Sequence, residues 1–203
     1  MMITQSFLYN AIFFTYPGVL VNFFHVNTSD TASYFIPFAI GNLLEPWILG
    51  RLFDKIGRRK MISRTYIVSG VLLAGSAFVF RAGGFTAITQ TLVWCVIFFF
   101  ASAGASAAYL TVSEIFPMEV RAQAIAVFFA IAQSFGAIAP LFYASLIDRS
   151  HPDMSSLFVG FLVGAIAMII GGLVAPVLAV DAENKSLEEV APPLSVVRAE
   201  SET

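Results

Sequence analysis

Long apolar stretches alternate with short polar ones along almost the whole chain, and this pattern is the strongest structural signal in the sequence. The apolar stretches cover residues 3–25, 32–52, 61–80, 87–113, 122–147 and 156–180. A helix that crosses a bilayer needs about 20 consecutive, mostly apolar residues. The pattern therefore predicts six transmembrane helices, which together account for nearly all of the chain.

The composition of the chain agrees with this pattern. Hydrophobic residues make up 58% of the 203 residues, charged residues only 12%, and 21 residues are Phe. A water-soluble fold of this size would expose large apolar patches, which are an aggregation hazard, so the composition disfavours a soluble domain. We predict an all-α integral membrane protein, with a transmembrane bundle over residues 1–181 and a polar cytoplasmic tail over residues 182–203.

The connections between the predicted helices are short. Three of them are "NTSD" (27–30), "RAGGF" (81–85) and "DRSHPD" (148–153), and their Gly, Pro, Asn and Asp residues are typical of turns. Short connections make consecutive helices antiparallel neighbours. We therefore expect each helix to pack against the next one in a single bundle.

Positive charge is concentrated on one side of the predicted membrane. Of the eleven Lys and Arg residues, six flank the second connection, between residues 51 and 64. Because cytoplasmic loops carry an excess of Lys and Arg, we expect this connection and the fourth one to lie in the cytoplasm. Six spans then place both termini there as well, in a multi-pass protein of the cell membrane.

Two features predict irregular and closely packed helices. Prolines within a helix remove a hydrogen-bond donor and free the carbonyl group four residues earlier, so kinks are expected where they occur. The prolines within the predicted spans are Pro17, Pro37, Pro46, Pro140 and Pro176. The run "ASAGASAA" (101–108) has no side chain larger than Ser, which favours close helix packing; a role in contacting a ligand is the alternative.

Residues that could support catalysis or bind a metal are sparse. His25 and His151 fall in predicted outer turns, and the single cysteine, Cys95, lies in mid-membrane within an apolar run. None of them belongs to the kind of Cys, His or carboxylate cluster that a metal site or a catalytic centre needs. We expect no enzyme activity, no metal and no cofactor.

The charged turn after the second predicted span has a distinctive spacing. In "GRLFDKIGRRK" (50–60), Gly50 and Gly57 suit positions where helix ends approach closely or the backbone is left-handed, and Arg59 extends a basic rim. The spacing of Gly50, Asp54, Gly57 and Arg58 resembles the loop signature of the major facilitator superfamily of secondary transporters. The alternative is a positive loop that only sets the membrane orientation.

Two further segments strengthen this resemblance. "SEIFPMEVRAQA" (113–124) is similar to the Glu-x-Phe-Pro-x-x-x-Arg element of the sugar porters and of related metabolite:proton symporters, and "ENKSLEEV" (183–190) is similar to the sugar-porter tail. Asp181 and Ala182 replace the proline that normally opens that tail. In the family, this order of elements belongs to the C-terminal six helices of a twelve-helix bundle. The chain is therefore expected to be half of such a bundle.

The resemblance implies a role for the charged residues of both cytoplasmic connections. Carried over from the family, Asp54, Arg58, Glu114 and Arg121 form an ion-pair latch that holds two bundles together in the outward-open state. Exposed ion pairs contribute only about 0–1 kcal/mol each. A weak latch of this kind suits a protein that must cycle between two states.

The first predicted helix carries candidate substrate contacts. "QSFLYNAIFFTY" resembles the Gln-x-x-x-x-Asn pattern of the seventh helix of the sugar porters, which assigns sugar binding to Gln5 and Asn10. On a regular helix Gln5 shares a face with Tyr9, whereas Asn10 lies off that face. In the family this helix is locally broken, which would let both residues face a cavity.

Three more polar residues in later spans match sugar-porter positions. Asn42, Tyr109 and Gln133 stand where that family places a sugar-contacting Asn, an aromatic residue and a polar residue of the eleventh helix. Polar groups at mid-membrane depth mark either a cavity or a hydrogen bond between helices. Both interpretations stay open for each residue, although the group as a whole favours a cavity for a polar ligand.

Glu45 is the one acidic residue clearly inside a predicted span. It lies about 7–8 Å from Gly50 along the helix axis, at 1.5 Å per residue. A buried carboxylate is costly unless it is paired or protonated. Glu45 is therefore expected either to pair with a basic residue of the loop or to act as a proton site.

The expected function is transport of a sugar or another small polar metabolite across a membrane by alternating access, coupled to protons or facilitative. The partners implied are the lipid bilayer, the substrate, protons and a missing N-terminal six-helix half, with a second copy of the chain as a substitute; no nucleic acid is expected. The alternative is a six-helix scaffold or regulatory protein that binds a partner bundle and transports nothing.

Overall fold

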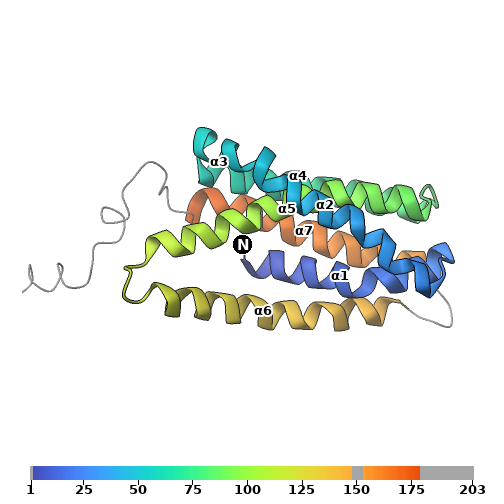
Figure 1. Cartoon of the computed structure of the whole chain (residues 1–203). Helices are drawn as coiled ribbons and strands as arrows, with labels where there is room; N and C mark the ends of the chain where they lie inside the picture. Colours follow the sequence, from blue (N-terminus) through green and yellow to red (C-terminus); the bar gives the residue numbers. More distant parts are fainter. Residues whose placement is uncertain (1, 148–152, 179–203) are drawn as a thin grey trace, which may run out of the picture.

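The computed structural model describes residues 2–147 and 153–178, and every regular element in these ranges is helical (Figure 1). The elements are α1 (Met2–Phe24), the 3₁₀ helix η1 (Thr28–Phe35), α2 (Ile36–Ile48), α3 (Gly50–Ile56), α4 (Arg58–Arg81), α5 (Ala87–Ile115), α6 (Arg121–Leu146) and α7 (Met154–Leu178). The expected tail over residues 182–203 and the turn residue His151 lie outside the described residues.

Five of these helices, α1, α4, α5, α6 and α7, are long and apolar enough to cross a membrane. They coincide with five of the six predicted spans. Together with their apolar outer surface, on which Val177, Leu141 and Phe14 are 76%, 73% and 70% exposed, they make the protein an all-α membrane protein. Such side chains fit a lipid environment, because exposing an apolar side chain to acyl chains carries no free-energy penalty.

The second predicted span, residues 32–52, is not a single long helix. It is divided among η1, α2 and α3, and α2 has only 13 residues. The break falls at Leu49, three residues after Pro46, and the Leu49 N–H group is shared between the carbonyl groups of Glu45 and Pro46. Proline has no N–H group to donate to the hydrogen bonds of the helix, and the regular bonding pattern ends just after it.

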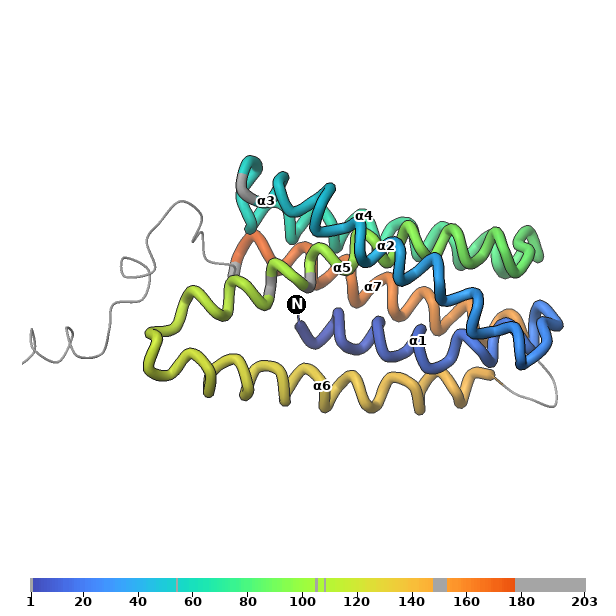
Figure 2. The backbone as a smooth tube through the Cα atoms, in the orientation of Figure 1, coloured from blue at the N-terminus to red at the C-terminus, as the bar shows by residue number. Residues whose placement is uncertain are grey.

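The most extensive packing is not between consecutive helices: it joins α4 to α7 and α1 to α6, followed by the consecutive pair α4 and α5 and then by α2 with α5. The expected contacts between consecutive helices are present for α4 with α5, α5 with α6 and α6 with α7, although the last two are small. Figure 2 shows α1 and α6 running side by side. Short turns make neighbours in sequence antiparallel, but the complementary side-chain surfaces decide which helices meet.

The small-residue run in α5 confirms close helix packing. A Cβ atom on Gly104 would collide with the aromatic ring of Tyr66 on α4, and it would lie 3.2 Å from the Thr65 hydroxyl oxygen. Tyr66 is fully buried. The absence of a side chain at Gly104 therefore lets a large aromatic residue of one helix rest directly against the backbone of the other.

Aromatic side chains join α1, α2 and α5 at one end of the bundle. Tyr16 lies with its ring centroid 4.8 Å from that of Trp94 and 5.8 Å from that of Phe38. The Tyr16 hydroxyl group is 2.6 Å from the Thr91 hydroxyl oxygen. This hydrogen bond satisfies a polar group that would otherwise be buried among apolar rings.

Most of the prolines do not interrupt the helices that contain them. Pro37 occupies the first turn of α2, where the missing N–H group would have no partner in any case. Pro17, Pro140 and Pro176 lie inside α1, α6 and α7, and all three helices continue through them. Among the described helices, only the α2–α3 segment is interrupted near a proline.

Asp153 caps the N-terminus of α7. Its carboxylate accepts hydrogen bonds from the backbone N–H groups of Ser155 at 2.9 Å and Ser156 at 3.2 Å, and from the Ser156 hydroxyl group. These bonds hold the pKa of Asp153 below its usual value, because they stabilise the charged form. They satisfy donors that the first turn of a helix leaves free.

The contact between Gly104 and Tyr66 predicts an asymmetry between two glycines. Gly104→Val should destabilise the fold by about 1–3 kcal/mol through overpacking. Gly75→Val in α4 is the matched control, since a Cβ atom there meets nothing within 4 Å. Thermal unfolding of the two variants in detergent measures the difference, and equal losses of stability would contradict the close packing described for Gly104.

Candidate functional site

A polar cluster joins α1 to α6. The Ser6 hydroxyl group donates a hydrogen bond of 2.5 Å to Oε1 of Gln133. The Asn10 side-chain amide donates to the Ser6 carbonyl oxygen at 2.8 Å and to Oε1 of Gln133 at 3.3 Å. Two of the predicted substrate residues, Asn10 and Gln133, are thus brought together across 123 positions of sequence.

Gly136 makes room for this cluster. A Cβ atom there would lie 2.6 Å from the side-chain nitrogen of Asn10 and even closer to the Ser6 hydroxyl oxygen. Beside the cluster is an open cavity of about 480 Å³. Its lining residues are Asn10, Phe14, Gln133, Gly136, Ala137 and Pro140. The cavity is therefore apolar on most sides and carries two amide groups at one edge.

A second polar pair joins α1 to α2. The side-chain amide of Asn42 donates a hydrogen bond of 2.5 Å to the hydroxyl oxygen of Tyr9. Tyr9 stacks on Phe13 with ring centroids 4.6 Å apart. Among the described residues, two buried oxygen atoms near this part of α1 have no hydrogen-bond partner: Oδ1 of Asn42 and Oε1 of Gln5.

The expected local break of the first helix is wrong, because α1 is one continuous helix from Met2 to Phe24. Asn10 extends to α6, whereas its neighbour Tyr9 extends to α2. A regular helix turns by about 100° per residue, so these two adjacent polar residues face different neighbouring helices. Gln5 and Asn10 therefore do not converge through a broken backbone.

Tyr109 stands apart from both polar groups. The described ring contact of Tyr109 is with Phe129 on α6, at a centroid distance of 6.0 Å. Its side chain is half-buried. No described contact joins Tyr109 to Asn10, Asn42 or Gln133, so the structure gathers these candidates into two pairs and one separate residue.

The two predicted cytoplasmic connections meet through an ion pair. Arg58, at the start of α4, pairs with Glu114 near the end of α5, and their side chains are 17% and 19% exposed. The turn before Arg58 contains Gly57 with φ of +96°, a left-handed conformation that favours glycine. The sequence therefore placed this glycine correctly, and it lets α4 begin directly after α3.

The other predicted latch residues lie differently. Arg121 donates to the Phe116 carbonyl oxygen at 3.4 Å, and Arg59 is half-buried. Gly50 begins α3 without a positive φ, and a Cβ atom there would meet nothing within 4 Å. The expectation that Gly50 serves a close approach or a left-handed turn is therefore wrong. The Asp54 side chain is not among the described ones.

Glu45 lies near the C-terminal end of α2, which the predicted orientation places on the cytoplasmic side. It is only 2% exposed. The hydroxyl groups of Ser102 and Ser106 on α5 lie near its carboxyl group. It borders a cavity of about 400 Å³ that Arg58 also lines. The small residues of the α5 run thus have two sides: Gly104 packs against α4, while two serines face a carboxyl group on α2.

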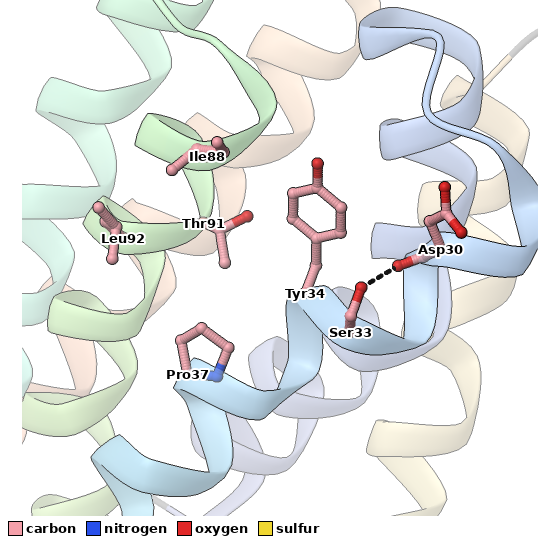
Figure 3. A pocket seen from close by; sticks show the side chains of 7 residues that line it. All are labelled: Asp30, Ser33, Tyr34, Pro37, Ile88, Thr91 and Leu92. Carbon is pink, nitrogen blue, oxygen red and sulfur yellow. Dashed lines mark hydrogen bonds between the residues drawn. The ribbon is translucent and has the colours of Figure 1, made fainter.

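A further cavity, of about 440 Å³, lies at the opposite end of the α2–α5 pair (Figure 3). Its lining residues are Asp30, Ser33, Tyr34, Pro37, Ile88, Thr91 and Leu92. Tyr34 and Thr91 face this space from two different helical segments (Figure 3). The α2–α5 pair therefore has one cavity near each end, separated by the packed aromatic side chains of its middle.

Sequence reasoning missed several residues that complete these sites. Ser6, Gly136, Ser102 and Ser106 are common small residues in apolar runs, and their types alone carry no signal. The spacing of Ser6 and Asn10, four residues apart, was the one available sign that both face α6. The other contacts depend on which helices meet.

A family model described as "Sugar (and other) transporter" matches residues 1–192. No curated protein matches the sequence. Within residues 2–147 and 153–178, no three His, Cys, Asp or Glu side chains lie close enough to hold a metal ion.

The ion pair between α4 and α5 can be tested by a double-mutant cycle. Arg58→Ala, Glu114→Ala and the double variant should show a coupling of about 1 kcal/mol, because the pair is mostly shielded from solvent. Thermal unfolding in detergent measures it. Lys60→Ala, combined with Glu114→Ala, is the control, since Lys60 is exposed; a coupling no larger than in this control would argue against the Arg58–Glu114 pair.

Proposed function

Since the chain belongs to the sugar (and other) transporter family, we propose that it carries a sugar or another small polar metabolite across the membrane by alternating access. This is a family of transporters and not of enzymes. The observation that carries the proposal is that α1, α2 and α6 bring amide and hydroxyl groups together, two of them beside the open cavity between α1 and α6. In the proposed function these groups bind the substrate.

The oxygen atoms without partners support a ligand rich in hydroxyl groups. Oε1 of Gln5 and Oδ1 of Asn42 are buried acceptors that lack a described donor. An unsatisfied buried polar group costs about 1–3 kcal/mol. A sugar hydroxyl group that donated to either oxygen would remove this cost, so binding would be favoured by chemistry already present in the bundle.

The Asn10–Gln133 pair provides a second set of contacts. Gln133 is exposed and Asn10 is half-buried, and both border the open cavity between α1 and α6. Amide groups both donate and accept hydrogen bonds, which suits the hydroxyl groups of a sugar. Tyr109 of α5, whose ring contacts that of Phe129 on α6, would contribute an aromatic surface.

We further propose that residues 1–181 form a six-helix bundle whose polar face is completed by a second one, the N-terminal half of a twelve-helix transporter or a second copy. Polar groups that face lipid are costly, so Gln133 favours a protein partner over the bilayer. The segment of η1, α2 and the start of α3 would be the sixth span, since residues 32–52 as helix extend for about 30 Å, the thickness of the hydrocarbon core.

The charged turns fit a latch on the cytoplasmic side. In the proposed cycle, Asp54, Arg58, Glu114 and Arg121, with Gly50, Gly57 and Arg59 in the same turn, hold the bundles in the outward-open state and release them in the inward-open state. A bias of a few kcal/mol is sufficient to shift such a two-state equilibrium strongly. Both termini would be cytoplasmic, in a protein of the cell membrane, and protons would drive transport.

Gly136 permits a test of the substrate contacts without removal of a polar side chain. Gly136→Ala should displace Asn10 and Ser6 and raise the apparent substrate constant roughly three- to tenfold, which corresponds to the loss of about one hydrogen bond. Gly75→Ala is the control, because its Cβ atom meets nothing. Uptake of a radiolabelled sugar panel by each variant, co-expressed with the complementary six-helix half, measures both; equal constants for the two variants would place the substrate elsewhere.

The need for a second bundle is a separate prediction. Proteoliposomes that contain this chain alone should show no substrate-specific uptake, because one bundle offers a single wall of the cavity. Co-expression with the complementary six-helix half should produce saturable uptake. Saturable uptake by the chain alone would favour a pair of identical copies, and correctly inserted halves that stay inactive together would favour a scaffold without transport.

A further inference from the structure

We propose that Glu45 is a proton-binding site that connects the Tyr9–Asn42 pair to the Arg58–Glu114 ion pair. The proposal rests on the proposed transport function only for its consequence, which is that proton binding would bias the transport cycle. Proton binding itself is a property of the bundle. It can therefore be tested on this chain whether or not transport is observed.

The surroundings of Glu45 accommodate both protonation states. A buried carboxylate is tolerated only if it is paired, hydrogen-bonded or protonated, and Glu45 is 2% exposed. The hydroxyl groups of Ser102 and Ser106 lie near it, and Ser106 lines the same cavity. A hydroxyl group can donate to a charged carboxylate and can accept the hydrogen of the neutral acid, so in the proposed site either state finds a partner within reach.

A cavity gives protons access to this carboxyl group. Its volume of about 400 Å³ is enough for several water molecules, each of which occupies about 30 Å³. Glu45 and Ser106 line one part of it, and Arg58 and Gly50 line the part next to the α3–α4 turn. Water in this space would connect the carboxyl group to the side of the bundle where the ion pair lies.

Arg58 lies between two carboxyl groups. It pairs with Glu114 and shares the cavity with Glu45. A deprotonated Glu45 attracts the Arg58 guanidinium and competes with Glu114, whereas a protonated Glu45 does not. Proton binding at Glu45 should therefore strengthen the Arg58–Glu114 pair, and by reciprocity that pair should favour proton binding.

Other ionisable groups near α2 do not duplicate this role. On α3, Arg51 and Lys55 are exposed and do not line the cavity. On α1, Tyr9 lies within electrostatic reach of Glu45, and a tyrosine is neutral at physiological pH. On α5, Glu114 acts through Arg58. Arg58 is thus the charged side chain that shares the cavity wall with Glu45 among the described residues, and in the proposal it responds to the charge of Glu45.

The connection to the substrate side runs along α2. Asn42 precedes Glu45 by three residues, so both lie on one face of the helix, and Asn42 binds the Tyr9 hydroxyl group. A substrate that recruits Asn42 would disturb the same short segment that holds Glu45. The segment ends at the Leu49 break after Pro46, where α2 can adjust without moving α3 as a rigid extension.

Infrared difference spectroscopy of the chain in lipid tests the proton site directly. A pH titration should show the C=O stretching band of a buried protonated carboxyl group, and Glu45→Gln should abolish it. Glu119→Gln is the control, since Glu119 is an exposed acid in the α5–α6 turn, and it should leave the band unchanged. A band that survives in Glu45→Gln would overturn the proposal.

The hydrogen bonds provide a second readout in case Glu45→Gln does not fold. Replacing both Ser102 and Ser106 by Ala keeps the carboxyl group but removes its partners, so the band should move to higher frequency. An unchanged frequency would show that the serines do not contact the protonated acid. A titration that depends on sodium concentration as well as pH would make this a metal-cation site and would also overturn the proposal.

The coupling to the ion pair has its own test. Glu114→Gln releases Arg58 toward Glu45, so the midpoint of the carboxyl titration should fall by about one pH unit or more, the usual effect of a nearby positive charge. Glu114→Asp, which keeps the charge, should leave the midpoint near that of the unchanged chain. Equal midpoints for Glu114→Gln and Glu114→Asp would refute the coupling, while inactive transport with a normal titration would count only against the proposed function.

Discussion

Polar groups inside a lipid-embedded bundle must find partners within the protein, because the acyl chains offer none, and this constraint shapes the whole structure. Tyr16 forms a hydrogen bond with Thr91, and Ser6 and Asn10 both bond to Gln133. Two serine hydroxyl groups of α5 lie near Glu45 of α2. Each of these contacts joins two different helices. The polar residues therefore determine which helices meet as well as where a polar ligand could be held.

Small residues make these contacts possible. Gly104 lets Tyr66 lie against the backbone of α5, and Gly136 leaves the space that Ser6 and Asn10 fill. Without a hydrophobic driving force between helices in lipid, close packing of this kind supplies much of the association. The α5 run is thus both a packing surface toward α4 and, through Ser102 and Ser106, a polar surface toward α2.

The arrangement separates the bundle into regions with different tasks. The pair α4 and α7 has the most extensive packing, while the residues that line the cavities come mainly from α1, η1, α2, α5 and α6. Two adjacent residues of α1 bond to different helices: Tyr9 to α2 and Asn10 to α6. A small movement of α1 would therefore change both polar contacts together, which suits a protein that alternates between states.

The sequence by itself determined the class of protein and the ends of most helices, because apolar length and turn residues are local properties. It identified the five long spans, the left-handed Gly57 and the family to which the chain belongs. It did not predict the break at Leu49, the unbroken α1 or the pairing of helices that are distant in the chain. Asn10 and Gln133 were selected from sequence, but their contact was decided by the tertiary structure, because it depends on the match between the surfaces of α1 and α6. The same holds for Glu45 with Ser102 and Ser106, since nothing in an isolated apolar run shows which of its faces a buried carboxyl group will meet.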